Sequence, residues 1–337
     1  MLKKTAMLAI GLTAGVSLSA QAGTLEDVQK RGVVSCGVST GLAGFSQKDE
    51  KGQWSGMDVD VCRAVAAAVF GDDTKVQYKP LTAKERFTAL QSGEVDILSR
   101  NTTWTQSRDT SLGLNFVGVN YYDGQGFMVS KKLGVKSALE LDGATVCIQA
   151  GTTTELNLAD YFRANGLKYT AITFDTSDQT RAAFESGRCD VLTSDQSQLY
   201  ALRIGLQKPD EAIVLPEVIS KEPLGPAVRQ GDDVWFNIAK WSLAAMIEAE
   251  SLGITSKNAA DLVASGTPDQ KRFLGVEGDF GKNMGISNDW AKNITLKVGN
   301  YGESFERNVG QGSPLKIARG LNAQWNQGGI LYSWPIR

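Results

Sequence analysis

The feature that most constrains the fold is a short sequence that occurs twice. Residues 89–98 read ALQSGEVDIL and residues 183–192 read AFESGRCDVL, so Ala, Ser-Gly, Asp and Leu recur at a spacing of 94 residues. Both copies stand where an amphipathic segment is followed by a short apolar run, which is typical of a helix leading into a buried strand. The repetition predicts two lobes of similar build.

Each copy belongs to a longer alternation of strands and helices. In the first we expect strands at 33–38, 76–78 and 95–98, with helices at 58–70 and 84–91. In the second we expect strands at 144–148, 171–174 and 189–193, with helices at 152–165 and 178–186. This β-α-β-α-β order predicts an α/β fold in which each lobe has a mostly parallel sheet flanked by helices.

Two stretches are predicted to connect the lobes, 121–125 and 220–224. If both are crossovers, lobe 2 (126–219) is inserted into lobe 1 (23–121 and 225–337), and the paired linkers form a hinge. Lobe 1 then resumes with a strand at 226–229, a long helix from about Asp233 and a C-terminal extension of shorter helices and loops. We expect Trp290, Trp325 and Trp334 in that extension to be packing anchors rather than a ligand cage.

The first 22 residues are expected to be a secretory signal peptide. Lys3 and Lys4 precede an apolar run at 6–18, and Ala20-Gln21-Ala22 is an A-x-A cleavage site. The mature chain should begin at Gly23, without a lipid anchor and without a later membrane span. The formal net charge of −2 gives no indication of nucleic-acid or anionic-membrane binding.

The sequence contains no histidine, which excludes Ser-His-Asp and Cys-His sites and any His-ligated metal. We expect no cofactor and no metal. The four cysteines are Cys36, Cys62, Cys147 and Cys189. An even number in an exported protein predicts two disulfides. The pairs Cys36–Cys62 and Cys147–Cys189 keep each bridge within one lobe and leave the hinge free.

Polar residues follow the predicted strand at 95–98. The segment SRNTTWTQSRD, residues 99–109, contains Asn101, Thr103 and Arg108. Ligands bind at strand ends in open α/β sheets, and a guanidinium meets a carboxylate with two parallel hydrogen bonds. This loop is therefore a candidate site for a small carboxylate. The alternative is a polar loop with a surface arginine.

The second lobe offers matching groups. Gly151, Thr152 and Thr153 open a predicted helix, whose N-terminus presents free N–H donors to an anion. Asp195 lies just past a strand end. Simple helix capping is the alternative role both for the two threonines, with Glu155 completing a capping box, and for Asp195.

Four motifs occur in this order: Gly56-x-Asp58-x-Asp60, Thr105-x-x-Arg108, Gln149-x-Gly151-Thr152-Thr153 and Gly187-x-x-Asp190-x-x-x-x-Asp195. Through them, over about residues 31–250, the chain resembles solute-binding proteins of polar amino acid ABC importers. It looks most like the general L-amino-acid-binding subgroup, including the glutamate/glutamine/aspartate/asparagine type. The resemblance implies the two-lobed type II periplasmic binding fold.

The resemblance also implies roles for individual residues. Arg108 would bind the α-carboxylate of an L-amino acid, with Asn101 and Thr103 beside it. Gly151, Thr152 and Thr153 would also take the carboxylate, and Asp195 would receive the α-ammonium. Members selective for basic side chains carry an acidic residue and an aromatic where this chain has Ser39 and Leu42, which predicts broad side-chain tolerance. Trp54 is a candidate pocket wall or a core residue.

The resemblance implies a monomer in the periplasm that delivers its ligand to an inner-membrane ABC permease. Two alternatives remain open from the sequence. A dehydratase-like enzyme on the same fold needs a general acid, usually Glu or His, and none lies in the four motifs. A ligand-presenting sensory protein would need a separate receptor.

Overall fold

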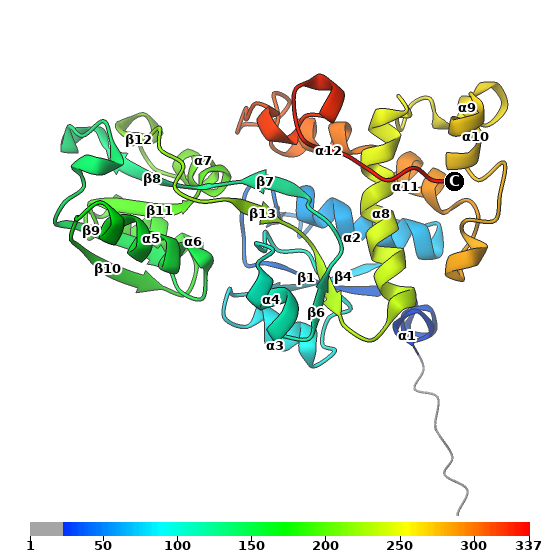
Figure 1. Cartoon of the computed structure of the whole chain (residues 1–337), viewed down its shortest axis with the longest axis horizontal. Coiled ribbons are helices and arrows are strands. Elements are labelled where there is room, and N and C mark those ends of the chain that lie inside the picture. Colours follow the sequence, from blue (N-terminus) through cyan, green and yellow to red (C-terminus); the bar gives the residue numbers. More distant parts are fainter. Residues whose placement is uncertain (1–22) are drawn as a thin grey trace, which may run out of the picture.

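The computed structural model describes residues 23–337 and has two lobes, each built on its own five-stranded sheet (Figure 1). The predicted signal peptide, residues 1–22, lies outside the described residues. Within the described part of the chain, no helix has the length and apolar character needed to cross a bilayer.

The lobe 1 sheet has the strand order β4-β1-β5-β14-β6. Its strands are β1 (Val34–Ser39), β4 (Val76–Leu81), β5 (Ile97–Leu98), β6 (Leu114–Phe116) and β14 (Ala227–Arg229). β1 runs parallel to β4 and β5, whereas β14 is antiparallel to β5 and β6. β4 continues through Pro80, which an edge strand tolerates because it has no neighbour on one side.

The lobe 2 sheet repeats this arrangement in the order β10-β9-β11-β8-β12. Its strands are β8 (Gln125–Ser130), β9 (Ala144–Gln149), β10 (Tyr169–Phe174), β11 (Val191–Asp195) and β12 (Ala212–Val214). β9 is parallel to β10 and β11, and β8 is antiparallel to both of its neighbours. Each sheet therefore has one reversed strand, at the same place.

The reversed strands result from the way the chain passes between the lobes. β7 (Tyr121–Asp123) and β13 (Glu222–Leu224) pair antiparallel in the connection, and each leads directly into the reversed strand of the next sheet, β8 or β14. Figure 1 shows this two-stranded ribbon between the sheets. Both strands fall in the segments predicted as hinges, and their hinge role remains a prediction.

Helices cover both sheets. Those of lobe 2 are α5 (Thr153–Ala164), α6 (Ser177–Glu185) and α7 (Gln196–Ile204). Those of lobe 1 are α1 (Thr24–Arg31), α2 (Met57–Phe70), α3 (Arg86–Gln91), α4 (Gln106–Ser111), α8 (Asp233–Ser251), α9 (Ala259–Ser265), α10 (Pro268–Phe273), α11 (Trp290–Lys297) and α12 (Tyr301–Asn308). A two-stranded ribbon, β2 (Gln47–Lys48) with β3 (Trp54–Ser55), completes lobe 1.

The lobe 1 core is the larger one because α2 is buried between the sheet and α8. Its Val, Ala and Cys side chains pack below β1, and the C-terminal helices pack against α8. The start of α2 needs Gly56, whose φ is 131° and whose position would put a Cβ 2.1 Å from the carbonyl oxygen of Phe45. This close approach explains the glycine of the first motif.

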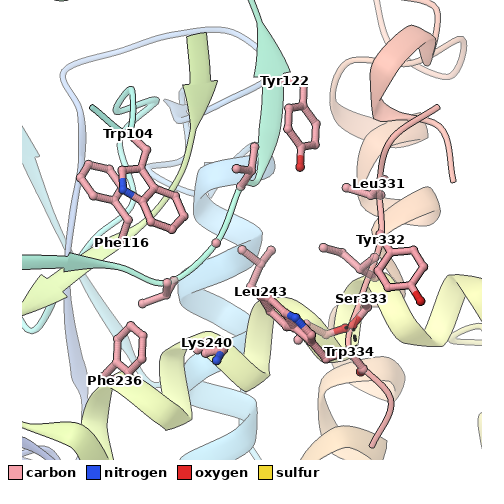
Figure 2. Close-up of a pocket in the computed structure, with 15 residues that line it drawn as sticks. Trp104, Phe116, Tyr122, Phe236, Lys240, Leu243, Leu331, Tyr332, Ser333 and Trp334 are labelled. Carbon is pink, nitrogen blue, oxygen red and sulfur yellow. Dashed lines mark hydrogen bonds between the residues drawn. The ribbon is translucent and has the colours of Figure 1, made fainter. Parts of the chain in front are cut away.

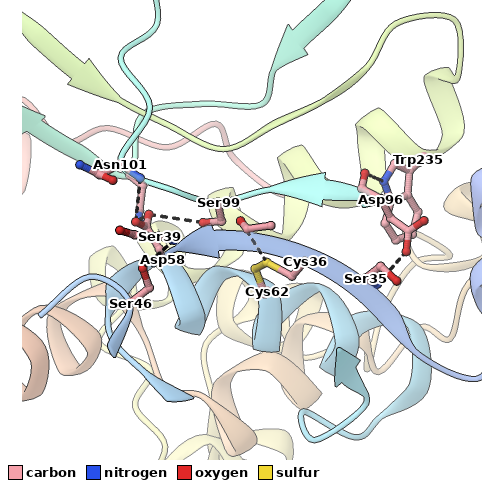
Figure 3. The surroundings of a disulfide bond; sticks show 12 residues. Ser35, Cys36, Ser39, Ser46, Asp58, Cys62, Asp96, Ser99, Asn101 and Trp235 are labelled. Atoms are coloured by element: carbon pink, nitrogen blue, oxygen red, sulfur yellow. Dashed lines mark hydrogen bonds between the residues drawn. A yellow bond between two sulfur atoms is a disulfide. The ribbon is translucent and has the colours of Figure 1, made fainter. Parts of the chain in front are cut away.

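Both predicted disulfides are confirmed. Cys36–Cys62 joins β1 to α2 (Figure 3), and Cys147–Cys189 joins β9 to the segment before β11. Their Cα–Cα distances are 6.2 and 5.6 Å, within the usual range. Neither bridge crosses between the lobes.

The tryptophans of the C-terminal extension have different surroundings. Trp290 is buried, as expected of a packing anchor. Trp325 and Trp334 are 57% and 48% exposed. Trp334 packs on Trp241 of α8, with ring centroids 6.4 Å apart, so it holds the tail on the surface of lobe 1 rather than inside a core.

Candidate functional site

A small cavity lies where the two lobes meet. Lobe 1 and lobe 2 both contribute its polar lining: Arg86, Arg100, Asn101, Thr103, Gln149, Thr152, Thr153, Thr154, Ser194, Asp195 and Gln198. Its volume is about 20 Å³, which is room for about one water molecule. A larger ligand can enter only if the lobes move apart.

Direct contacts between the lobes keep the cavity small. Asn101 Nδ2 donates to Gln198 Oε1 at 3.2 Å, and the hydroxyls of Thr103 and Thr153 lie 3.3 Å apart. At the rim, Lys84 pairs with Asp175 at 2.7 Å. The structure is therefore a closed arrangement.

The lobe 1 side is formed by the loop after β5. Asn101 has a φ of 34°, which is unusual for a residue other than glycine. Asp58, buried in the first turn of α2, holds this conformation by accepting from the Asn101 backbone N–H at 2.7 Å (Figure 3). Burial raises the pKa of Asp58 to about 6, although hydrogen bonds and Arg100 oppose the shift. The first aspartate of the Gly-x-Asp-x-Asp motif thus supports the loop.

Arg108 is the third residue of the short helix α4. Thr105 caps this helix by accepting from the Arg108 N–H at 3.3 Å. The Arg108 guanidinium donates to the Thr103 carbonyl oxygen at 2.9 Å and lies 5.2 Å from the centre of the Phe87 ring. Burial lowers the pKa of Arg108, and the nearby carboxylates of Glu222 and Asp195 oppose this shift. Arg108 is thus beside the cavity, although it is not part of its lining.

Glu222 of β13 is a site residue that sequence reasoning missed. It is 1% exposed, and its carboxylate accepts from donors of both lobes and of the connection. Its Oε2 accepts from the hydroxyls of Thr103 at 2.6 Å and Thr153 at 2.9 Å. Its Oε1 accepts from Asn157 and Ser220, both at 2.7 Å. The two threonine hydroxyls predicted to bind a carboxylate therefore already bind one.

Asp195 ends β11 and stands at the N-cap position of α7, but its side chain makes no capping hydrogen bond. Instead, Asp123 of β7 accepts from the Ser197 N–H at 3.4 Å and from the Ser197 hydroxyl. The helix-cap interpretation of Asp195 is therefore wrong. Burial raises the pKa of Asp195 well above its usual value, Asp123 and Glu222 raise it further, and Arg86 and Arg108 oppose the shift.

The start of α5 supplies the rest of the lobe 2 side. Gly151 has a φ of 76°, and its N–H donates to Glu155 at 2.8 Å. Thr152 occupies the N-cap position without a capping bond, and its hydroxyl donates to the Gln149 carbonyl oxygen at 2.7 Å. The expected capping box does not form, because Thr152 makes no capping bond and Glu155 accepts from the N–H of Gly151 rather than from that of Thr152.

Ser39 and Leu42 do not line this cavity. Ser39 is buried at the end of β1, where its N–H donates to the Ser46 hydroxyl at 3.0 Å. Leu42 lies at the edge of a separate hollow of about 280 Å³ between the lobes, opposite Ala201 and Leu202 of α7. Trp54 packs on Tyr78 at the surface of the lobe 1 core, with ring centroids 5.8 Å apart, and is not in the cavity lining.

Another hollow, of about 310 Å³, lies on lobe 1 away from the interlobe cavity. Figure 2 shows Trp104 and Phe116 on one side of it and Tyr332 and Trp334 of the tail on the other. Lys240 is the one charged residue in its lining, and it lies 4.7 Å from the centre of the Trp334 ring. With no carboxylate in its lining, this hollow is less suited to a zwitterion than the interlobe cavity.

Arg86 and Arg100 are also cavity residues that sequence reasoning missed. Arg86 begins α3, Arg100 follows β5, and each is 2% exposed. Arg100 stands within the polar segment 99–109, so its place beside Asn101 was a usable signal. Arg86 lies in an ordinary amphipathic helix, and nothing in the local sequence marks it as a cavity residue.

The chain is similar to known proteins over most of its length. Residues 34–258 match the model of the bacterial extracellular solute-binding proteins, family 3. The chain is 62% identical to the general L-amino acid-binding periplasmic protein AapJ of Rhizobium johnstonii, over 98% of this chain and 96% of that protein. It is 53% identical to the glutamate/glutamine/aspartate/asparagine-binding protein BztA of Rhodobacter capsulatus, over the whole of both chains.

A solved structure covers nearly the same length. An ABC transporter periplasmic binding protein from Brucella ovis, with glutathione bound, is 58% identical and superposes with a TM-score of 0.92. The match covers 94% of this chain and 100% of that one. The C-terminal extension is therefore shared with a solved relative.

Proposed function

Because the chain belongs to the bacterial extracellular solute-binding proteins of family 3, we propose that it binds free L-amino acids, with broad side-chain tolerance, in the periplasm and delivers them to an ABC permease. The relatives that match over nearly the full length are named amino-acid-binding proteins of such systems. We infer that the protein is a monomer and that it does not catalyse a reaction of its ligand.

The observation that carries the proposal is the opposition of charges across the cavity. The carboxylate of Asp195 lines the cavity from lobe 2, and the guanidinium of Arg108 lies beside the cavity on lobe 1, near enough for Asp195 to affect its pKa. An amino acid zwitterion carries its two charges on neighbouring groups, so it can engage both side chains only when the lobes are close together. Its higher affinity for the closed form would shift the population toward closure.

Ligand binding would also require a change of hydrogen-bond partners. In the closed structure, Thr103 and Thr153 both donate to Glu222. Each hydroxyl has one hydrogen to donate, so neither can donate to a ligand carboxylate until it leaves Glu222. We infer that the hydroxyls exchange Glu222 for the ligand as the lobes open and close.

Glu222 also bears on the enzyme alternative. A glutamate lies closer to the cavity than the four sequence motifs suggested. Both of its oxygens, however, are occupied by four protein donors. A general acid has to reach the substrate, so this arrangement favours a structural role over catalysis.

A thermal-shift screen against the twenty amino acids, followed by mass spectrometry of the ligand, tests the proposal. Ligands that bind the folded protein raise the midpoint according to RT ln(1 + [L]/Kd). We expect several amino acids of different side-chain classes to stabilise the protein and to be recovered unchanged. Stabilisation by none of them would refute the proposal, and recovery of a chemically altered compound would support the enzyme.

A further inference from the structure

The hollow of about 310 Å³ on lobe 1 has the size and the lining of a small-molecule site (Figure 2). Ligand pockets in proteins begin at about 300 Å³ and are mostly apolar and aromatic, with a few polar groups that orient the ligand. The hollow shares no lining residue with the interlobe cavity. Its aromatic lining residues are Trp104, Phe116, Tyr122, Phe236, Tyr332 and Trp334.

Both walls of the hollow are fixed by contacts with the rest of lobe 1. On the tail side, the Ser333 hydroxyl donates to the Ala244 carbonyl oxygen at 3.0 Å, which holds the tail against α8. On the opposite side, Trp104 stacks on Phe116 with ring centroids 5.5 Å apart, and its backbone N–H donates to the Pro223 carbonyl oxygen at 2.8 Å. The hollow is therefore part of the fold rather than a gap under a loose tail.

Lys240 of α8 is the charged group of the lining, and Figure 2 shows it between Phe236 and the tail residue Trp334. The ring centres of Phe236, Trp241 and Trp334 lie 5.8, 5.9 and 4.7 Å from its Nζ. Within residues 23–337 this ammonium has no ion-pair partner, and the residues one turn away on α8, at 236, 237, 243 and 244, are uncharged. Aromatic faces attract a cation, but they leave its three N–H donors without a strong acceptor.

We propose that this hollow is a second binding site, which takes a small aromatic monocarboxylate. The ligand ring would pack among the aromatic walls, where stacked and edge-to-face contacts are favourable, and its carboxylate would accept a charge-assisted hydrogen bond from Lys240. An amino acid fits less well, because no carboxylate lines the hollow to receive an ammonium and Lys240 repels one. The site goes beyond the amino-acid-binding function proposed above and does not depend on it.

Calorimetry with phenylacetate, phenylacetamide and acetate tests the site. Phenylacetamide keeps the ring and the shape without the charge, and acetate keeps the charge without the ring. We expect phenylacetate to bind with a Kd below about 1 mM and about tenfold or more tightly than phenylacetamide. Acetate should not bind at about that concentration.

Lys240→Met removes the charge and keeps the apolar stem of the side chain. It should weaken phenylacetate binding by about tenfold and change phenylacetamide binding by less than about threefold. Its unfolding midpoint without ligand should equal that of the wild type, which separates a loss of binding from a loss of fold. Lys257→Met is the matched control, because Lys257 is an exposed lysine of lobe 1 outside the lining, and its affinities should be those of the wild type.

Arg108→Ala shows which site the carboxylate occupies, because a carboxylate in the interlobe cavity would use that guanidinium. We expect Arg108→Ala to bind phenylacetate as the wild type does. Loss of phenylacetate binding in Arg108→Ala, with normal binding in Lys240→Met, would place the ligand in the interlobe cavity and overturn the second site. Equal affinities of the wild type for phenylacetate and phenylacetamide, or binding of neither, would also overturn it.

Discussion

The two copies of the internal repeat place an aspartate at the same junction, yet the pKa values of the two carboxyl groups are shifted in opposite directions. In lobe 1, Asp96 Oδ2 accepts from the Ser35 N–H at 2.7 Å, and in lobe 2, Asp190 Oδ2 accepts from the Thr145 N–H at 2.9 Å. Asp96 is 3% exposed and burial raises its pKa. Asp190 is exposed, and its hydrogen bonds with Thr145 lower its pKa.

The difference comes from what covers each junction. In lobe 1, Trp235 of α8 donates its indole N–H to the Asp96 carbonyl oxygen at 2.9 Å, and Arg31 of α1 pairs with the Asp96 carboxylate. Figure 3 shows Asp96, Ser35 and Trp235 gathered at one end of β1. Lobe 2 has no equivalent of α8 among residues 126–219. The repeat therefore determines the local hydrogen bond, and the later helices determine its environment.

The two lobes also differ in the charged groups that they present at the interlobe cavity. Lobe 1 contributes the guanidiniums of Arg86 and Arg100 to the lining and that of Arg108 beside it. The charged group that lobe 2 contributes is the carboxylate of Asp195. Two lobes with one topology thus present complementary surfaces. The following predictions test this contrast between the lobes.

The largest effect is expected from removing the lobe 1 partner of the ligand carboxylate. Arg108→Ala should abolish measurable amino-acid binding, because it removes the fork that meets the carboxylate and leaves that carboxylate buried without its partner. Arg108→Lys should restore only part of the affinity, since an ammonium keeps the charge but not the paired geometry. Calorimetry measures both, with Arg188→Ala, an exposed arginine of lobe 2, as control. Normal binding by Arg108→Ala would remove Arg108 from the site.

The lobe 2 counterpart is Asp195. Asp195→Ala should cost roughly 2–5 kcal/mol of binding free energy, because the ligand ammonium is then buried without a partner. Small-angle scattering should show the variant open at ligand concentrations that close the wild type. Asp195→Asn provides a version of similar size, and Asp178→Asn, an exposed residue of α6, is the control.

The raised pKa of Asp195 gives this prediction a second measurement. A ligand ammonium favours the ionised carboxylate, so binding should release a proton from wild-type protein wherever Asp195 is still protonated. The apparent affinity should then rise with pH through the pKa of Asp195, and Asp195→Asn should lack this dependence. Calorimetry in buffers of different ionisation enthalpy detects the proton. Equal proton release by Asp195→Asn would show that another group titrates.

How much of this was predictable from sequence depends on whether the signal is local. The repeat, the glycine at position 56 and the even number of cysteines are local signals, and they led to the fold and to both disulfides. Arg108 and Asp195 were predicted as ligand-binding residues through motifs, and their roles remain predictions. Glu222 was counted as part of a connector, because its four hydrogen-bond donors lie at 103, 153, 157 and 220 and meet only after the lobes assemble. Arg86 was missed for the same reason.

The disulfides test whether the lobes are stabilised separately. In the loop-entropy model, removing either bridge should cost about 3–4 kcal/mol of unfolding free energy, with the lobe 2 bridge slightly more costly because its loop is longer. The sequence separations are 26 for Cys36–Cys62 and 42 for Cys147–Cys189. Denaturant unfolding of the two double Cys→Ser variants measures these costs. Because neither bridge spans the cavity, both variants should bind ligand normally at temperatures where they are folded.

The smallest effect is expected at the two repeat aspartates, where the sign matters more than the size. The lowered pKa of Asp190 means that its ionised form stabilises the fold above the unfolded pKa, and that this contribution is lost as pH falls through the folded value. Asp190→Asn should therefore cost about 1 kcal/mol at neutral pH, from weakened hydrogen bonds with Thr145, and nothing at low pH.

Asp96 behaves oppositely, because its raised pKa means that the fold gains stability as pH falls through that value toward the unfolded one. Asp96→Asn should remove this gain on acidification. Denaturant midpoints measured across the acidic range compare the two variants, and a parallel response of both would show that the cover from α8 and α1 does not control the environment of Asp96.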